Sequence, residues 1–144
     1  DVDGDLDLAL PNSKDDDLTI LLGNGDGTFG TGQDFPTGEK PVFLTMADLN
    51  DDGRADIVVS EERYPGLEPD AGLYWFSSDA EVQHWEKHVI VTQYSMNNLD
   101  VADIDGDGDL DGFYGRSNGL SYYFENTGSA VAPSFAAPTQ SPFG

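Results

Sequence analysis

The sequence has no cysteine, few cations and no long apolar run, and each absence removes a class of protein. Without cysteine there is no disulfide framework, no thiolate metal site and no cysteine nucleophile. The 6 lysines and arginines stand against 28 aspartates and glutamates, a net charge of −22. This balance excludes a nucleic-acid partner, because phosphates are bound by clustered cations. No apolar stretch approaches the roughly 18–20 residues that span a bilayer, so we expect no membrane insertion.

Helical periodicity is also absent, since no stretch of a dozen residues places apolar side chains at helical spacing. The 17 glycines and 8 prolines are typical of a turn-rich chain. Because 38% of the residues are hydrophobic, the acidity does not by itself indicate disorder. The 144-residue length suggests one domain, and the composition predicts an all-β fold.

One acidic pattern recurs along the chain. Residues 48–56 and 103–111 both read D-x-[DN]-x-D-G-x-x-D, and residues 1–7 fit the last seven positions of the same pattern. The aspartates at the ninth position, Asp7, Asp56 and Asp111, are spaced by 49 and 55 residues. These spacings are near the length of a β-propeller blade, which holds about four strands.

The segments between the acidic motifs contain short β-rich runs separated by turn residues. They divide the chain into blade 1 with the entry strand of blade 2 (1–47), blade 2 with the entry strand of blade 3 (48–102), and blade 3 with a C-terminal connector (103–144). Strands are expected near residues 6–10, 18–22, 28–35, 42–47, 56–60, 72–76, 85–91, 99–102, 112–115, 121–125 and 134–136. Four aromatic residues are expected to pack between blades, namely Trp75, Phe76, Phe113 and Phe124.

The acidic loops predict calcium sites. Several carboxylates converging in nine residues would repel one another unless a hard cation lay between them, and calcium accepts 6–8 oxygen ligands with loose geometry. We expect two to three ions per chain, with the second site weaker because Asn50 replaces a carboxylate. The predicted ligands are Asp1, Asp3, Asp5 and Asp7 in the first loop; Asp48, Asn50, Asp52, Arg54 and Asp56 in the second; and Asp103, Asp105, Asp107, Asp109 and Asp111 in the third. Asp5, Arg54 and Asp109 would contribute their backbone carbonyls.

The main competing interpretation is an EF-hand, which requires a glutamate at the twelfth position and a helix on each side of the loop. That position holds Leu10, Val59 or Tyr114, and strand-like residues follow each loop. The helix–loop–helix interpretation therefore fails.

These loops, together with residues 22–29, 73–76 and 123–128, resemble the FG-GAP or VCBS repeats, which also form the propeller of integrin α chains. The resemblance implies four-stranded propeller blades with calcium loops between strands, usually in secreted or surface-exposed proteins. Closed propellers need roughly 4–8 blades, and this chain supplies about three. We therefore expect an incomplete propeller that is completed by a homo-oligomer or polymer, or by the remainder of a larger propeller.

Other residues admit two interpretations. Tyr64, Tyr94, Asn97 and Asn98 have the chemistry that binds sugars, but packing of blade interfaces and capping of turns is the favoured interpretation. His84 and His88 could bind a transition metal or lie on the surface of a strand. Glu61 and Glu62 are adjacent, so they should point to opposite faces of a strand and cannot act as a catalytic pair.

The sequence thus predicts an extracellular, secreted or cell-surface module in which calcium is structural. Its expected role is adhesion, protein interaction or self-assembly, without enzymatic activity, and its ligand would be a protein or a glycan. Two alternatives remain open, namely a carbohydrate-binding module and a scaffold fragment of a polysaccharide-active enzyme.

Overall fold

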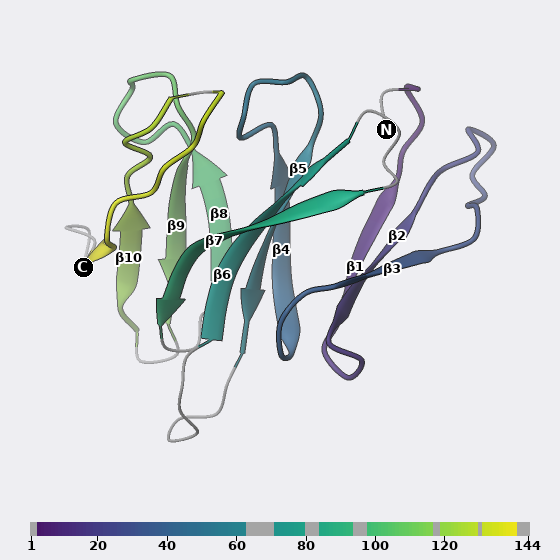
Figure 1. Ribbon diagram of the computed structural model, residues 1–144, viewed down its shortest axis with the longest axis horizontal. Helices are drawn as coiled ribbons and strands as arrows, with labels where there is room; N and C mark the ends of the chain where they lie inside the picture. The colour runs from purple at the N-terminus through teal and green to yellow at the C-terminus, as the bar shows by residue number, and fades with distance from the viewer. Residues whose placement is uncertain are drawn as a thin grey trace.

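The computed structural model describes residues 3–62, 71–79, 84–93, 98–116, 119–129 and 131–140. Over these residues the chain forms strands and turns in three antiparallel sheets (Figure 1). The all-β prediction is confirmed. No helix within the described residues has the length and apolarity needed to cross a membrane.

The three sheets follow one another along the chain, and within each sheet neighbouring strands are consecutive in sequence. The N-terminal sheet contains β1 (Leu8–Asn12), β2 (Asp17–Leu21) and β3 (Gln33–Pro36). The central sheet contains β4 (Pro41–Ala47), β5 (Asp56–Glu61), β6 (Ala71–Ser78) and β7 (Trp85–Gln93). The C-terminal sheet contains β8 (Asn98–Ala102), β9 (Asp111–Gly115), β10 (Ser121–Phe124) and β11 (Thr139–Gln140).

The last strand differs from the prediction. It was expected at 134–136, but β11 pairs with β10 at Thr139 and Gln140. Phe135 makes only an isolated bridge with Asn126. The Ser134 N–H donates to the Asn126 side chain at 2.9 Å, so this backbone closes a turn instead of extending the sheet.

The third strand also begins later than predicted, at Gln33 instead of residue 28. The Asp26 carboxylate accepts hydrogen bonds from both the backbone N–H and the hydroxyl of Thr28, at 2.9 and 2.6 Å. Such side-chain bonds to the local backbone compete with strand pairing. Only an isolated bridge joins Gly23 and Phe29 before β3 begins.

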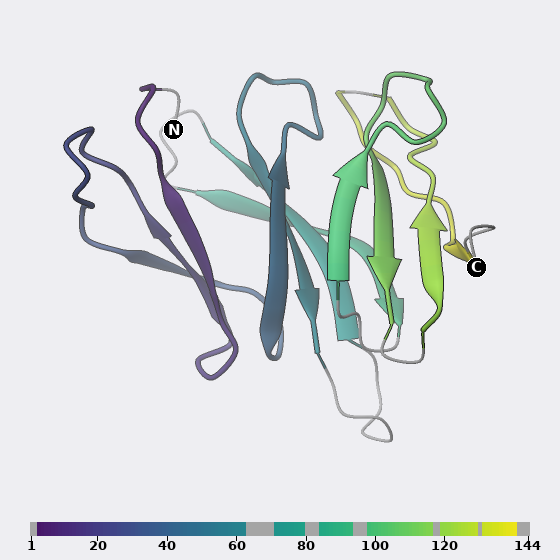
Figure 2. The ribbon, with the colours of Figure 1, turned by 180° about the vertical axis from the view of Figure 1, so that it is seen from behind.

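The central sheet lies between the other two and packs against both (Figures 1 and 2). The core shared with the N-terminal sheet has the buried residues Leu18, Ile20, Ile57, Val59 and Phe76. The core shared with the C-terminal sheet has the buried residues Leu49, Val58, Leu73, Trp75, Tyr114 and Phe124.

Strand β5 contributes to both cores. Ile57 and Val59 face the N-terminal sheet and Val58 faces the C-terminal sheet, because successive side chains of a strand point to opposite faces. Every residue of β5 is buried. A strand covered on both faces explains the continuous apolar run 57–59.

Three of the four predicted aromatic core residues, Trp75, Phe76 and Phe124, lie in these cores. The prediction for Phe113 was wrong, because this residue is half-buried and belongs to neither core. Its neighbour Tyr114 occupies the position that faces the central sheet, so Phe113 points to the opposite face.

Truncating a core aromatic should destabilise the protein far more than truncating an exposed apolar residue. We expect Phe76→Ala to lower the free energy of unfolding by about 3–5 kcal/mol, through lost burial and the cavity left behind. The control Val89→Ala, at a residue that is 62% exposed, should change it by less than about 0.5 kcal/mol. Urea denaturation measures both, and similar losses would contradict the assignment of this core.

Candidate metal centre

The acidic loops occupy equivalent places in the three sheets. The second loop (48–56) joins β4 to β5, and the third loop (103–111) joins β8 to β9. The described part of the first loop (3–7) leads directly into β1. Figure 1 shows the second and third loops at the same end of their sheets.

The three loops share a backbone geometry. In each loop the N–H of the seventh residue donates to the carboxylate of the fifth residue. The pairs are Asp5 to Asp3 at 2.8 Å, Arg54 to Asp52 at 2.9 Å and Asp109 to Asp107 at 2.9 Å. The sixth-position glycines Gly4, Gly53 and Gly108 have φ of 94°, 83° and 98°, a conformation that side chains with Cβ rarely adopt. The repeated pattern therefore specifies one repeated loop conformation.

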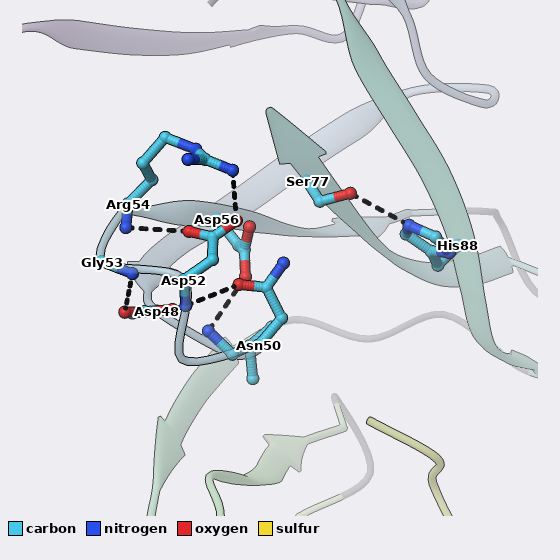
Figure 3. Close-up of polar contacts among 9 residues, drawn as sticks. Asp48, Asn50, Asp52, Gly53, Arg54, Asp56, Ser77 and His88 are labelled. Carbon is cyan, nitrogen blue, oxygen red and sulfur yellow. Dashed lines mark hydrogen bonds and ion pairs between the residues drawn. The ribbon is translucent and has the colours of Figure 1, made fainter. Parts of the chain in front are cut away.

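In the second loop, side-chain oxygens accept several backbone N–H groups (Figure 3). Asp48 accepts the N–H of Asp52 at 3.0 Å and of Gly53 at 2.8 Å, and Asn50 accepts the same Asp52 N–H at 3.3 Å. The Arg54 guanidinium pairs with Asp52 at 2.5 Å. This loop thus contains a cation of its own beside one of its carboxylates.

The ninth-position aspartates connect the loops to the sheets. Asp56 and Asp111 are fully buried. One oxygen of each aspartate accepts the backbone N–H of the second residue in its own loop. Asp56 accepts from Leu49 at 2.9 Å, and Asp111 accepts from Ile104 at 3.1 Å. Each carboxylate therefore fixes the turn that precedes its own strand.

The hydrogen bonding of the other carboxylate oxygen at the ninth position differs between the second loop and the first and third loops. Asp7 Oδ1 accepts the Gly23 N–H and Asp111 Oδ1 accepts the Asn126 N–H, both at 2.8 Å. Asp56 Oδ1 is buried and has no hydrogen-bond partner within the described part of the chain. Burial, together with the charges of Asp52 and Asp48, raises the pKa of Asp56 to about 6.

Asp111 has a third donor. The Tyr123 hydroxyl donates to Asp111 Oδ2 at 3.2 Å. Burial and the Asp111 charge raise the pKa of Tyr123, so the hydroxyl keeps its proton. The third loop is therefore attached to β10 as well as to β9.

The third loop fits a divalent cation. Asp103, Asp105 and Asp111 each place a carboxylate oxygen within 4.8 Å of the others. Two oxygens at about 2.4 Å from one calcium ion can be at most about 4.8 Å apart. In the second loop, the buried Asp56 oxygen has no partner among the residues that the structure describes, and a cation in the loop would satisfy it.

The remaining predicted ligands differ in their exposure and in their distance from the close trio of the third loop. Asp107 lies outside the close trio, and its Oδ1 accepts the Asp109 N–H. Asp3 and Asp5 are exposed, Asp7 is half-buried, and Asp1 lies outside the described residues. Of the predicted sugar-binding residues, Asn98 is exposed at the start of β8. Tyr64, Tyr94 and Asn97 lie outside the described residues.

The two histidines have separate partners. His84 precedes β7 and its Nδ1 lies 2.9 Å from Asp79. The His88 ring stacks on Trp75 with ring centroids 4.1 Å apart. His84 lies outside β7, which begins at Trp85, so strand alternation does not place the two histidines on one face.

Sequence reasoning missed a polar cavity beside the second loop. Ser77 Oγ lies 3.1 Å from His88 Nε2 (Figure 3). These two residues line a cavity of about 290 Å³ together with Asn50, Trp75, Glu86 and residues 131–133. Alternation along β6 and β7 could have placed Ser77, Trp75, Glu86 and His88 on one face, but only the pairing register brings them opposite one another.

The adjacent residues Glu61 and Glu62 differ in burial, which agrees with the expectation that they point in opposite directions. Glu61 is buried and accepts the Gly72 N–H at 2.7 Å, whereas Glu62 is exposed. Gly38 lies so close to Glu61 that an added Cβ would be 1.4 Å from its carboxylate. Glu61 therefore has a packing role inside the sheet.

Residues 1–59 match the family model of the FG-GAP-like repeat. This segment belongs to the FG-GAP-like repeat family. The match includes the first two acidic loops and ends within β5, and the third loop repeats their geometry outside it. The FG-GAP-like repeat indicates a β-propeller-type module for protein interaction. No curated protein and no solved structure matches the chain.

The bond between Tyr123 and Asp111 should stabilise the third loop. We expect Tyr123→Phe to lower the free energy of unfolding by about 1–3 kcal/mol, because a hydrogen bond to a buried charge is lost. Tyr122→Phe is the matched control, since among the described residues the Tyr122 hydroxyl only accepts a long hydrogen bond, at 3.5 Å from Arg116. Urea denaturation compares the two, and an equal loss would contradict this role of Tyr123.

Proposed function

We propose that this chain is a calcium-stabilised, non-enzymatic interaction module of the β-propeller type, acting outside the cell in adhesion or assembly. The observation that supports calcium best is the third loop, where three carboxylates from a nine-residue segment approach one another. The same loop conformation recurs in each sheet.

Calcium would act by relieving charge repulsion. The carboxylates of Asp103, Asp105 and Asp111 are close together in a chain of net charge −22, and this repulsion opposes folding. A cation bound among these carboxylates would attract each of them and so offset their mutual repulsion. Because the unfolded chain does not gather these ligands, the binding free energy of the ion adds to the stability of the fold.

An extracellular location agrees with the nature of the loops. Calcium sites of extracellular modules bind at about 10⁻⁴–10⁻³ M, a range that suits exposed loops with some neutral ligands. Asp103, Asp105 and Asp107 are exposed, and Asn50 replaces a carboxylate in the second loop. Stabilisation by calcium would then depend on the higher calcium concentration outside the cell.

Calcium removal should lower the melting temperature, and Asp105→Asn should reduce this effect. Asp105 belongs to the close trio, so the variant should hold one calcium ion fewer and melt earlier only in calcium. The control Asp15→Asn changes an exposed aspartate in the turn between β1 and β2. Native mass spectrometry counts the ions, and calorimetry with calcium or EDTA gives the melting temperatures.

Two results would refute the calcium assignment. One is a melting temperature that EDTA leaves unchanged in the wild-type protein. The other is the same ion count for wild-type protein and Asp105→Asn. Asp15→Asn should match the wild type in both measurements, which separates ligand loss from the general loss of negative charge.

Carbohydrate binding is a second candidate, favoured by the cavity beside Asn50. Its lining combines the Trp75 and His88 rings with Ser77 and Glu86, the aromatic and polar groups that recognise sugars. We expect a glycan array to give binding that Glu86→Ala lowers at least tenfold. Glu62→Ala, at an exposed glutamate outside the cavity, is the control. No binding, or equal loss in both variants, would exclude this cavity as a sugar site.

A further inference from the structure

Asn50 belongs to two candidate sites at once. It is the third residue of the second acidic loop, where its Oδ1 accepts the Asp52 N–H at 3.3 Å and where it is a predicted calcium ligand. The same residue lines the cavity of about 290 Å³ beside that loop. Figure 3 shows Asn50 between the other loop residues and the Ser77–His88 pair, which also lines the cavity. A change at Asn50 would therefore affect both sites.

An asparagine at this position can serve both sites, whereas an aspartate cannot. The third loop has Asp105 at the equivalent position. An ionised carboxylate only accepts hydrogen bonds, but a carboxamide has an accepting oxygen and an NH2 group with two donors. Oδ1 of Asn50 can therefore bind a cation while Nδ2 donates to a different group. Because the amide is planar, calcium bound to Oδ1 would also restrict the direction in which Nδ2 donates.

The other polar groups of the cavity suit a ligand with several hydroxyl groups. Ser77 and Glu86 stand opposite each other in the pairing of β6 with β7, and both line the cavity. A hydroxyl group both donates and accepts hydrogen bonds, so the hydroxyls of a sugar can pair with the Asn50 amide, the Ser77 hydroxyl and the Glu86 carboxylate. The cavity is near the lower end of the range for ligand pockets, roughly 300–1,000 Å³. It therefore fits a small ligand or the end of a larger one.

Rings and apolar side chains form the rest of the lining. The His88 ring stacks on Trp75 with centroids 4.1 Å apart, and its Nε2 lies 3.1 Å from Ser77 Oγ. These two contacts hold the ring in place. Residues 131–133, which lie between β10 and β11, add apolar groups. Small-molecule sites typically combine such apolar walls with a few placed polar groups that fix the orientation of the ligand.

The charge around the cavity favours an uncharged ligand. The described residues that line it include Glu86 but no lysine or arginine, and the chain has a net charge of −22. An acidic sugar would therefore be repelled. A cationic ligand would be repelled by a calcium ion in the second loop, so calcium would weaken its binding. An uncharged sugar avoids both penalties and gains the Asn50 donor.

We propose that this cavity binds an uncharged saccharide and that calcium in the second loop strengthens the binding through Asn50. In this arrangement Asn50 holds the ion through Oδ1 and donates from Nδ2 to a sugar hydroxyl. The inference rests on carbohydrate binding, the second candidate function above, and adds the class of sugar and its regulation. Because coupling between two ligands is reciprocal, the sugar also tightens calcium binding by the same factor.

A glycan array with uncharged, acidic and amino sugars identifies the probe. The wild-type protein in calcium should bind uncharged sugars and leave the charged ones unbound. The uncharged sugar that binds most tightly is then titrated by calorimetry, at a temperature where circular dichroism shows that the protein stays folded in EDTA. Its affinity should be at least tenfold higher in calcium than in EDTA. Calcium titrations with and without the sugar should show the same factor.

Asn50→Asp separates the two roles of this residue. The variant keeps an oxygen ligand, so native mass spectrometry should count as many calcium ions as in the wild type. It loses the Nδ2 donor, so its sugar affinity in calcium should fall at least tenfold. Asn24→Asp makes the same charge change at an exposed asparagine between β2 and β3. This control should keep the ion count and hold the sugar affinity within twofold of the wild type.

Three results would overturn the inference: equal sugar affinity in calcium and in EDTA, undiminished sugar binding by Asn50→Asp, or binding confined to charged sugars. Binding of amino sugars alone, weakened by calcium, would show a site for cations instead. If no sugar binds while EDTA still lowers the melting temperature, the sugar site falls and the calcium-stabilised module stands. If an uncharged sugar binds but EDTA changes neither its affinity nor the melting temperature, the calcium proposal falls together with this regulation, and the sugar site stands.

Discussion

Buried carboxylates at the start of β5 and β9 tie the acidic loops to the sheets. Burying a charge is costly unless hydrogen bonds or an opposite charge compensate it. Asp111 receives two backbone N–H groups and the Tyr123 hydroxyl. Asp56 has one oxygen without a hydrogen-bond partner among the described residues, and burial raises its pKa to about 6. The same position is thus satisfied by the protein itself in one sheet and incompletely satisfied in another.

The ninth-position carboxylate also fixes the facing of the strand that follows it, because it determines which side chains point toward each neighbouring sheet. In the central sheet, the first and third residues after Asp56 face the N-terminal sheet, and the second faces the C-terminal sheet. In the C-terminal sheet, the third residue after Asp111 is Tyr114, which faces the central sheet. A fixed loop of nine residues therefore keeps the strands in phase. A shift of one residue would exchange the two faces of each sheet.

The sequence predicted the fold well where side-chain chemistry dictates local backbone. The aspartate and glycine spacing located the loops, because the sixth position requires positive φ. The apolar runs located the inner strands of the central sheet, β5 and β6, which are buried on both faces. The final strand was misplaced because Phe135 packs against a core while its backbone is bonded in a turn. An apolar residue predicts that its side chain is buried, but it does not predict whether its backbone pairs with a neighbouring strand.

The candidate site was predictable only in part. The loop residues were recognisable because their spacing is local, whereas the cavity beside Asn50 depends on the register between β6 and β7. Sequence reasoning also could not show that one Asp56 oxygen lacks a hydrogen-bond donor among the described residues. Asp7, Asp56 and Asp111 share the ninth position, and only the three-dimensional arrangement shows that Gly23 and Asn126 donate to the first and last of them.

The outer faces of the N-terminal and C-terminal sheets both carry apolar side chains, and the C-terminal one also carries a charge. Leu8 and Leu10 are exposed apolar residues of β1. On β8, the exposed residues are Asn98 and Asp100, and they alternate with Leu99 and Val101, which pack against the core. Asp100 lies opposite Phe113, which in turn lies opposite Tyr123, so the charge has aromatic neighbours on the outer face of the C-terminal sheet. A surface that covers this face would have to compensate the charge of Asp100, because desolvating a carboxylate is costly.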